Sequence, residues 1–278
     1  MNDITEFERA IARHSADRLI SYKTVNGEEL VLALFFPENF YSGKSYPTFC
    51  MIHGGGWSTR KVFPDQPSWR GDYLGYLARY YADRGFVAVC IEYRLTRNRG
   101  QEPGFGLMEL WADCRDAVDY LTTHCGELGI DVNRMYMLGE SAGGYLVAAL
   151  ATDGNWQSPF AKVFLINPIT ELVTKPWLDF VPGNFKEPGW KERAKALSPL
   201  YQITKGTCET VLIHGAEDGT VSPDHSIQFC EEMKRQGNQC TLHLLEKTTH
   251  AFLLAEYYKG GLDACRKAVA IINQEVLS

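Results

Sequence analysis

The sequence predicts an α/β fold in which helices cover both faces of a mostly parallel eight-stranded sheet that opens with an antiparallel N-terminal hairpin. Three observations support this expectation. Short apolar runs alternate with amphipathic helical stretches from about residue 47 onward, which is typical of a parallel sheet. Asn26-Gly27 separates two strand-like runs, and this dipeptide favours a type I′ hairpin turn. No repeat, low-complexity run or linker interrupts the 278 residues, so we expect one domain over 1–278.

The expected elements follow the chain in order. A first helix is expected near 3–16, and the hairpin strands near 18–25 and 28–36. The six later strands are the apolar runs at 47–53, 86–94, 134–140, 161–168, 210–215 and 239–246. The helices between and after them are expected at 73–85, 107–129, 142–154, 222–237 and 261–276.

An irregular stretch at about 168–208 is longer than an ordinary connection between elements. It contains several Pro, Gly and Trp residues, and loops of this length are usually lids or binding elements. We therefore expect a small lid-like insertion with one short helix. Its aromatic residues, which could wall a pocket or pack locally, are Trp177, Phe180, Phe185 and Trp190.

Composition excludes several classes of protein. The net charge of −6 disfavours nucleic acid and anionic membrane surfaces as partners. No apolar run reaches the ~18–20 residues that span a bilayer, and the acidic N-terminus is unlike a signal peptide. As written, the chain is expected in the cytoplasm, or outside the cell if a signal peptide has been removed. The expected partner is a small molecule, and the sequence does not specify an oligomeric state.

The eight cysteines lie singly, with no CxxC pair and no clustered His/Cys spacing. We expect most of them to be buried free thiols and expect no metal site.

The strongest chemical signal is Gly139-Glu140-Ser141-Ala142-Gly143, a G-x-S-x-G pattern between a strand and a helix. A tight turn in this context exposes a serine hydroxyl, and the flanking glycines avoid collisions with neighbouring backbone. Ser141 is therefore the candidate nucleophile. A serine of this kind needs a general base and a group that orients the base.

The base and the orienting carboxylate should also follow strands. His250 lies in a polar loop between the last strand and the last helix, and Asp218 follows the strand at 210–215. His53 and His214 also end strands, but each precedes a glycine and is expected to fix loop geometry. His14, His124 and His225 are expected on helix surfaces, and His243 within a strand. Glu217 is the alternative carboxylate, although we favour Asp218.

The segment His53-Gly54-Gly55-Gly56-Trp57 follows another strand. It lacks the Lys-Ser/Thr of a phosphate-binding loop and the spacing of a dinucleotide-binding motif. An HGGG-type motif supplies backbone N–H groups to an oxyanion hole in lipases and esterases, together with the residue after the nucleophile. The candidate donors are therefore Gly55, Gly56 and Ala142. Trp57 and Glu140, adjacent to these residues, are the candidate substrate contacts, although Trp57 could equally serve local packing.

Taken together, "HGGGW", "GESAGG", "HGAEDGTVSPDHS" and "TTHAF" resemble the α/β-hydrolase superfamily, in particular its hormone-sensitive-lipase-like and acetyl-esterase-like branch, over about residues 18–276. The chain is also similar to bacterial esterases of carbohydrate esters. The resemblance implies a Ser141, Asp218, His250 triad and an acyl-enzyme mechanism without cofactor or metal. The chain differs from that branch in its short N-terminus and in "YRLTRNRGQEPGFG", where an Ala-Pro-Glu-type segment is usual.

The resulting functional expectation is a serine esterase for short-chain carboxylic esters, including acetyl or feruloyl esters of carbohydrates. A true lipase is disfavoured because the charged, proline-rich insertion offers no large apolar entrance. The alternative is an arylformamidase or another amidase on the same fold. An oligopeptidase is disfavoured because the chain has no room for a propeller domain. A binding protein that has lost catalysis is disfavoured because all three triad positions are occupied.

Overall fold

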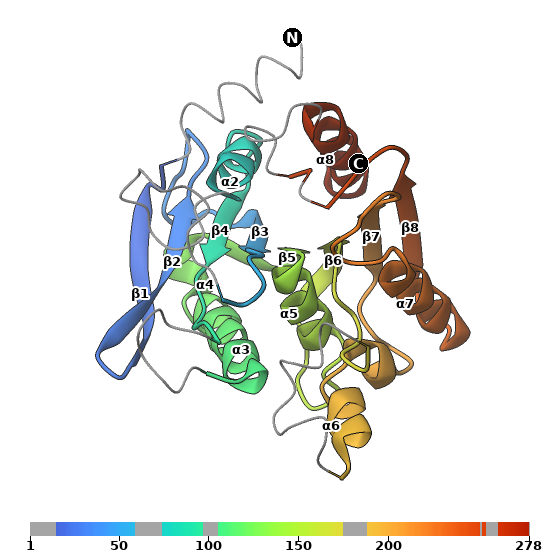
Figure 1. The fold of residues 1–278 in the computed structure, drawn as a ribbon. Helices are drawn as coiled ribbons and strands as arrows, with labels where there is room; N and C mark the ends of the chain where they lie inside the picture. The colour runs from blue at the N-terminus through green and yellow to red at the C-terminus, as the bar shows by residue number, and fades with distance from the viewer. Residues whose placement is uncertain are drawn as a thin grey trace.

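The computed structural model describes residues 15–58, 74–96, 105–174, 188–250, 252–253 and 261–277. Within these ranges the strands form an eight-stranded sheet in the order β1-β2-β4-β3-β5-β6-β7-β8 (Figure 1). The first two pairings, β1 with β2 and β2 with β4, are antiparallel, and the other pairings are parallel. This arrangement confirms the predicted α/β fold with its N-terminal hairpin.

The strands lie at the predicted apolar runs, although β5 begins four residues before the expected 134–140. They are β1 Arg18–Val25, β2 Glu28–Phe35, β3 Tyr46–Ile52, β4 Val87–Ile91, β5 Ile130–Glu140, β6 Phe160–Ile166, β7 Thr210–Gly215 and β8 Cys240–Leu245. In the hairpin, Asn26 has φ 52° and Gly27 has φ 80°. Two successive positive φ values are the signature of a type I′ turn, which explains why the Asn-Gly signal was informative.

Helices pack on both faces of the sheet (Figure 1). They are α2 Gly75–Ala82, α3 Leu107–Thr123, α4 Cys125–Leu128, α5 Ala142–Ala151, α6 Trp190–Ala196, the 3₁₀ helix η3 Pro199–Gln202, α7 Asp224–Arg235 and α8 Gly261–Val276. Buried residues of α3, α5 and α7 belong to one hydrophobic cluster, whereas those of α2 and α8 belong to a second. The sheet therefore separates two cores.

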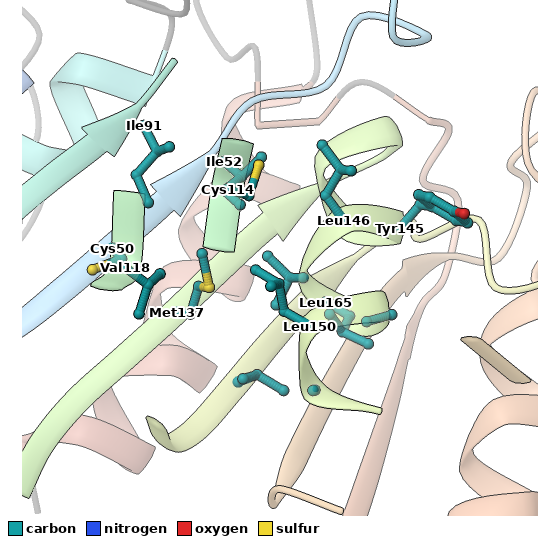
Figure 2. Packing of buried hydrophobic residues seen from close by; sticks show 14 of the residues in the cluster. Cys50, Ile52, Ile91, Cys114, Val118, Met137, Tyr145, Leu146, Leu150 and Leu165 are labelled. Carbon is teal, nitrogen blue, oxygen red and sulfur yellow. The ribbon is translucent and has the colours of Figure 1, made fainter. Parts of the chain in front are cut away.

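Strand β3 shows how one sequence supplies both cores. Cys50 and Ile52 belong to the α3/α5 cluster, whereas Phe49 and Met51 belong to the α2/α8 cluster. This alternation follows from the two-residue side-chain period of a strand. All four side chains are inaccessible to solvent, so the strand is apolar throughout its centre. Figure 2 shows the first cluster, with Cys50, Val118, Met137 and Leu146 packed between sheet and helices.

Two differences from the expected elements concern local detail, and some expectations lie outside the described residues. The single helix expected at 107–129 is divided at His124 into α3 and α4, and it ends at Gly129, which has φ 66°. The insertion holds η3 in addition to the expected short helix α6. The expected helix at 3–16 is not described before residue 15, and Trp177, Phe180 and Phe185 also lie outside the described residues.

Two further sequence expectations concern thiols and membrane spans. All eight cysteines are free thiols, and five of them are buried, as expected. Among the helices that the structure describes, none is both long and apolar enough to cross a bilayer.

Candidate active site

Ser141 lies in the sharp turn between β5 and α5. Its backbone has φ 54° and ψ −116°, a strained conformation for a residue with a side chain. Its amide donates a hydrogen bond to the carbonyl of Ile166 at 2.8 Å, which ties the turn to the end of β6. The side chain is 8% exposed. The predicted strand, turn and helix are therefore present around this serine.

The glycines beside Ser141 leave no room for side chains. A Cβ at Gly143 would overlap the carbonyl oxygens of Ile52 and His53, and a Cβ at Gly139 would overlap the carbonyl of Gly143. Because these obstacles are mostly backbone atoms, they cannot move aside as a flexible side chain can. Close approach of β3 to the start of α5 thus accounts for Gly143, and close approach of α5 to the end of β5 accounts for Gly139.

The structure brings Ser141, His250 and Asp218 into one hydrogen-bonded row. Nε2 of His250 lies 2.8 Å from Oγ of Ser141, and Nδ1 of His250 lies 2.6 Å from Oδ2 of Asp218. Asp218 follows β7, and His250 lies after β8. The three residues therefore meet at the carboxyl ends of three parallel strands, where ligands of α/β sheets bind.

Asp218 is buried and fully hydrogen-bonded. Its Oδ1 accepts the amides of Thr220 at 2.8 Å and Val221 at 3.0 Å, and its Oδ2 also lies 3.2 Å from Nε2 of His214. Burial alone would raise the pKa of the Asp218 carboxyl, but hydrogen bonds from His214 and His250 hold that pKa well below its ordinary value. Asp218 is thus a carboxylate at neutral pH.

The environment of His250 favours its protonated form. Burial would lower the pKa of the His250 imidazole, but the hydrogen bond to Asp218 and the negative charge of Glu140 together raise the pKa above its ordinary value. A histidine that gains a proton more readily is a stronger base. The row can therefore take a proton from the Ser141 hydroxyl and stabilise the resulting imidazolium.

The glycine-rich loop passes directly beside Ser141. A Cβ at Gly54 would lie 3.1 Å from Cβ of Ser141. Gly55, with φ 101°, is exposed, and Gly56, with φ 60°, is half-buried. Ala142 is the first residue of α5, where helix amides have no acceptor within the helix. Gly55, Gly56 and Ala142 thus lie near the nucleophile, and their role as oxyanion donors stays a prediction.

Trp57 packs into the scaffold beside the nucleophile turn. Its side chain is fully buried, its indole N–H donates to the carbonyl of Ala142 at 2.9 Å, and its ring packs edge-on against Tyr145 at 5.1 Å. Of the two roles that the sequence left open, local packing is the one found. Trp57 thus links the glycine loop to helix α5, and a substrate contact at this residue stays a prediction.

Glu140 is likewise buried, with only 4% of its surface exposed. Its Oε2 occupies the space that a side chain at Gly54 would need. The carboxylate lies against the glycine loop, and its charge helps to raise the pKa of His250. A substrate contact at Glu140 stays a prediction.

The remaining histidines differ in part from expectation. His53 is buried, its Nδ1 lies 2.8 Å from the carbonyl of Gly54, and its ring stacks on Tyr93, in agreement with a role in loop geometry. Burial lowers its pKa to about 4, so this imidazole is neutral at pH 7. His225, expected at the surface, is buried because it lies on the inner face of α7. His124 is half-buried, His243 lies in β8, and His14 is outside the described residues.

Sequence reasoning missed Asn167, the residue that follows β6. Its Oδ1 accepts the amide of Gly215 at 2.9 Å, and its Nδ2 donates to the carbonyl of His250. Its φ of 44° is one that asparagine tolerates better than most residues. Asn167 thus holds the His250 loop against the ends of two strands. A polar residue directly after an apolar strand was the signal that could have identified it.

Within the part of the chain that the structure describes, no group of three or more His, Cys, Asp or Glu side chains could hold a metal ion. Among the described residues, the groups available for chemistry at the site are the hydrogen-bonded row of Ser141, His250 and Asp218 and the adjacent backbone amides.

Residues 74–262, about two thirds of the chain, match the prolyl oligopeptidase family, whose members carry the α/β-hydrolase fold. The chain belongs to the prolyl oligopeptidase family. The match includes the Ser141 turn and both loops that carry Asp218 and His250. It places the chain within the superfamily that the motifs indicated.

Curated relatives are similar over most of this chain. A probable isoprenylcysteine alpha-carbonyl methylesterase of Arabidopsis thaliana is 23% identical over 258 residues, which is 84% of this chain and 51% of the relative. A dipeptidyl-peptidase 5 of Porphyromonas endodontalis is 25% identical over 82% of this chain and 33% of the relative. The chain thus spans about half the length of the methylesterases and a third of that peptidase.

Solved structures match over nearly their whole length. Esterase 2 of Thermogutta terrifontis with bound propionate is 24% identical, with a TM-score of 0.77 over 95% of this chain and 94% of that chain. The butyrate-bound structure of the same esterase is 26% identical, with a TM-score of 0.75. These similarities confirm the α/β-hydrolase fold.

Proposed function

We propose that this protein is a serine esterase that hydrolyses short-chain carboxylic esters through an acyl-enzyme intermediate. The single observation that carries the proposal is the row in which Ser141 Oγ meets His250 Nε2 at 2.8 Å and His250 Nδ1 meets Asp218 Oδ2 at 2.6 Å. This is the arrangement that nucleophilic catalysis by a serine requires. The similarly folded esterase of Thermogutta terrifontis has been solved with propionate and with butyrate bound, which favours short-chain esters as substrates of this protein.

In the proposed reaction, Ser141 Oγ attacks the ester carbonyl carbon while His250 Nε2 accepts the hydroxyl proton. Asp218 holds His250 by Nδ1 and stabilises the imidazolium. The carbonyl oxygen becomes negative beside the amides of Gly55, Gly56 and Ala142, and each such donor is typically worth about 3–4 kcal/mol in the transition state. The proton then passes from His250 to the departing alcohol. Water, activated by His250, releases the acid by the same route.

Esters of carbohydrates, with acetyl or feruloyl acyl groups, are the finer proposal for the substrate. Methyl esters are a further class to test, because curated relatives are named as methylesterases. The decisive measurement is kcat/KM on nitrophenyl esters from acetyl to decanoyl, acetylated xylan, methyl ferulate and a prenylcysteine methyl ester. We expect the highest values at two to four acyl carbons and a steep decline beyond them.

The nucleophile is tested by reaction with paraoxon, which phosphorylates the structurally similar esterase. We expect one covalent adduct, located on Ser141 by peptide mass spectrometry, and loss of both adduct and ester hydrolysis in Ser141→Ala. Ser21→Ala, an exposed serine on β1, is the matched control and should react like the wild type. Full hydrolysis by Ser141→Ala would overturn the proposal.

Amide hydrolysis is the second candidate, favoured by membership in the prolyl oligopeptidase family. It is tested by N-formylkynurenine, for an arylformamidase, and by dipeptidyl nitroanilides, for a peptidase. A kcat/KM on either amide above that on every ester would replace the esterase proposal by this one.

A further inference from the structure

The carboxylate of Asp218 has a second histidine as a partner. His214 lies in β7, four residues before Asp218, and its side chain is wholly buried. Its Nε2 lies 3.0 Å from the carbonyl of Val221 and 3.2 Å from Oδ2 of Asp218. Oδ2 is the same oxygen that meets Nδ1 of His250 at 2.6 Å. Two imidazoles therefore share one carboxylate oxygen.

The hydrogen-bond partners determine which nitrogen of His214 carries a proton. The carbonyl of Val221 can only accept, so Nε2 must be the protonated nitrogen. Nδ1 then accepts from the hydroxyl of Ser226, which lies 2.7 Å away and is itself fully buried. The ring is thus fixed at both nitrogens, with Nε2 bonded to the carbonyl of Val221 and 3.2 Å from Oδ2 of Asp218.

We propose that His214 is a positioning residue whose Nε2–H anchors Oδ2 of Asp218 and draws part of the carboxylate's negative charge away from His250. This inference rests on the proposed serine chemistry and extends it to a residue outside the triad. A hydrogen bond to a charged acceptor is worth more than one between neutral groups, so a bond at this distance both orients the carboxylate and reduces its pull on His250.

Other charged groups near this set do not replace His214. Among the described residues, Glu140 faces His250 from β5, and its charge raises the pKa of His250. His225 faces Asp218 and His214 from α7, and Glu171 and Asp224 act on His225. Burial lowers the pKa of His225, so it is neutral at pH 7. His214 and His250 are the side-chain donors to Oδ2 among these residues.

The test measures the rate of covalent labelling by a fluorophosphonate as a function of pH, because this reaction needs the triad but no particular substrate. In His214→Leu we expect the acidic limb of the profile to move up by about 0.5–1 pH unit, since His250 then faces the whole carboxylate charge. The plateau rate should fall roughly tenfold because Asp218 loses an anchor.

Two further variants separate this role from packing. His214→Asn, whose shorter amide keeps a polar group near Ser226 but does not reach Asp218, should show the same shift and provides the result if the leucine variant does not fold. His214→Gln, whose amide can restore the donor, should return the limb toward the wild-type position. His225→Gln is the matched buried control and should leave the limb unchanged.

The outcomes distinguish the two proposals. A wild-type protein that is not labelled overturns the proposed function, and this inference with it. A labelled wild type whose acidic limb is unchanged in the leucine and asparagine variants overturns only the role of His214. An equal shift in His225→Gln, or no recovery in His214→Gln, also overturns it.

Discussion

The two sides of the site are held in place by different means. On the nucleophile side, Gly143 packs against backbone so closely that even a Cβ would overlap carbonyl oxygens. On the acid–base side, Asp218 and His250 are held by hydrogen bonds to His214, Asn167 and loop amides. The first side depends on steric exclusion, and the second depends on polar contacts.

This difference determines how each side should respond to substitution. The closely packed glycines beside Ser141 leave no room for an added atom but take no part in hydrogen bonding by a side chain. A substitution at one of them should therefore act mainly on folding. A polar site keeps its shape when one atom is exchanged for a similar one, so a change there should act mainly on catalysis. The predictions below test this division.

Asp218→Asn should have the largest effect. The amide is nearly isosteric, so the fold should persist, but it cannot support the imidazolium of His250, and kcat should fall by about 10⁴-fold. Glu217→Gln, one residue earlier and exposed, is the matched control and should leave kcat unchanged. Burst kinetics on nitrophenyl acetate measures both. If the Asp218→Asn protein melts far below the wild type, the expectation that a change at this polar side acts mainly on catalysis is wrong.

Gly143→Ala should act on the fold. The added Cβ overlaps the carbonyls of Ile52 and His53, and we expect a loss of roughly 3–5 kcal/mol in the free energy of unfolding. Gly154→Ala is the matched control, because no atom lies within 4 Å of a Cβ there. Denaturant unfolding of both variants gives the comparison. A Gly143→Ala variant with wild-type stability but reduced kcat would contradict the expectation that changes on the nucleophile side act mainly on folding.

Trp57→Phe should have a smaller effect, because it removes one hydrogen bond between the two backbone segments. The ring still packs on Tyr145, but the carbonyl of Ala142 loses its 2.9 Å donor. We expect kcat/KM to fall about tenfold, mostly in kcat. Trp156→Phe, which removes an exposed indole bond to Asp119, is the control. Equal kcat/KM values for Trp57→Phe and Trp156→Phe would show that the hydrogen bond from Trp57 to Ala142 does not contribute to the reaction.

The smallest effect concerns pH. The pKa of His250 is raised, so the neutral base is lost, and kcat/KM falls, as pH decreases through a value above about 6.5. The sign for stability is opposite: protonated His250 stabilises the fold fully below about pH 6.5, and this contribution disappears as pH rises through the folded-state pKa. Rate profiles and thermal melts from pH 5 to 9, with His250→Gln in the melts, measure both. A limb below pH 6 would contradict the charge environment described for His250.

The sequence predicted the sheet and brought together the hydrogen-bonded row of Ser141, His250 and Asp218, because both leave local signals. Apolar runs such as that of β7 end at the predicted residue, and Ser141 is surrounded by glycines that a steric site requires. The sequence allowed local packing for Trp57 and a loop role for His214, but it could not name the partners of Trp57 and Asn167, because these contacts join residues far apart along the chain. The contact between His214 and Asp218 could not be predicted because it depends on burial of both side chains. His225 was placed wrongly because one helical residue does not reveal which face packs inward.

The distance along the chain between Ser141 and His250 has a consequence for folding. The hydrogen bond between Ser141 and His250 joins positions 109 residues apart, and it bridges β5, inside the sheet, to the loop that follows the edge strand β8. Contacts of this kind form late because long stretches of chain must be ordered first. The proposed reactivity of Ser141 is thus a property of the completed sheet. A chain whose β8 edge has detached would keep its central strands paired and yet hold a serine that no longer reacts.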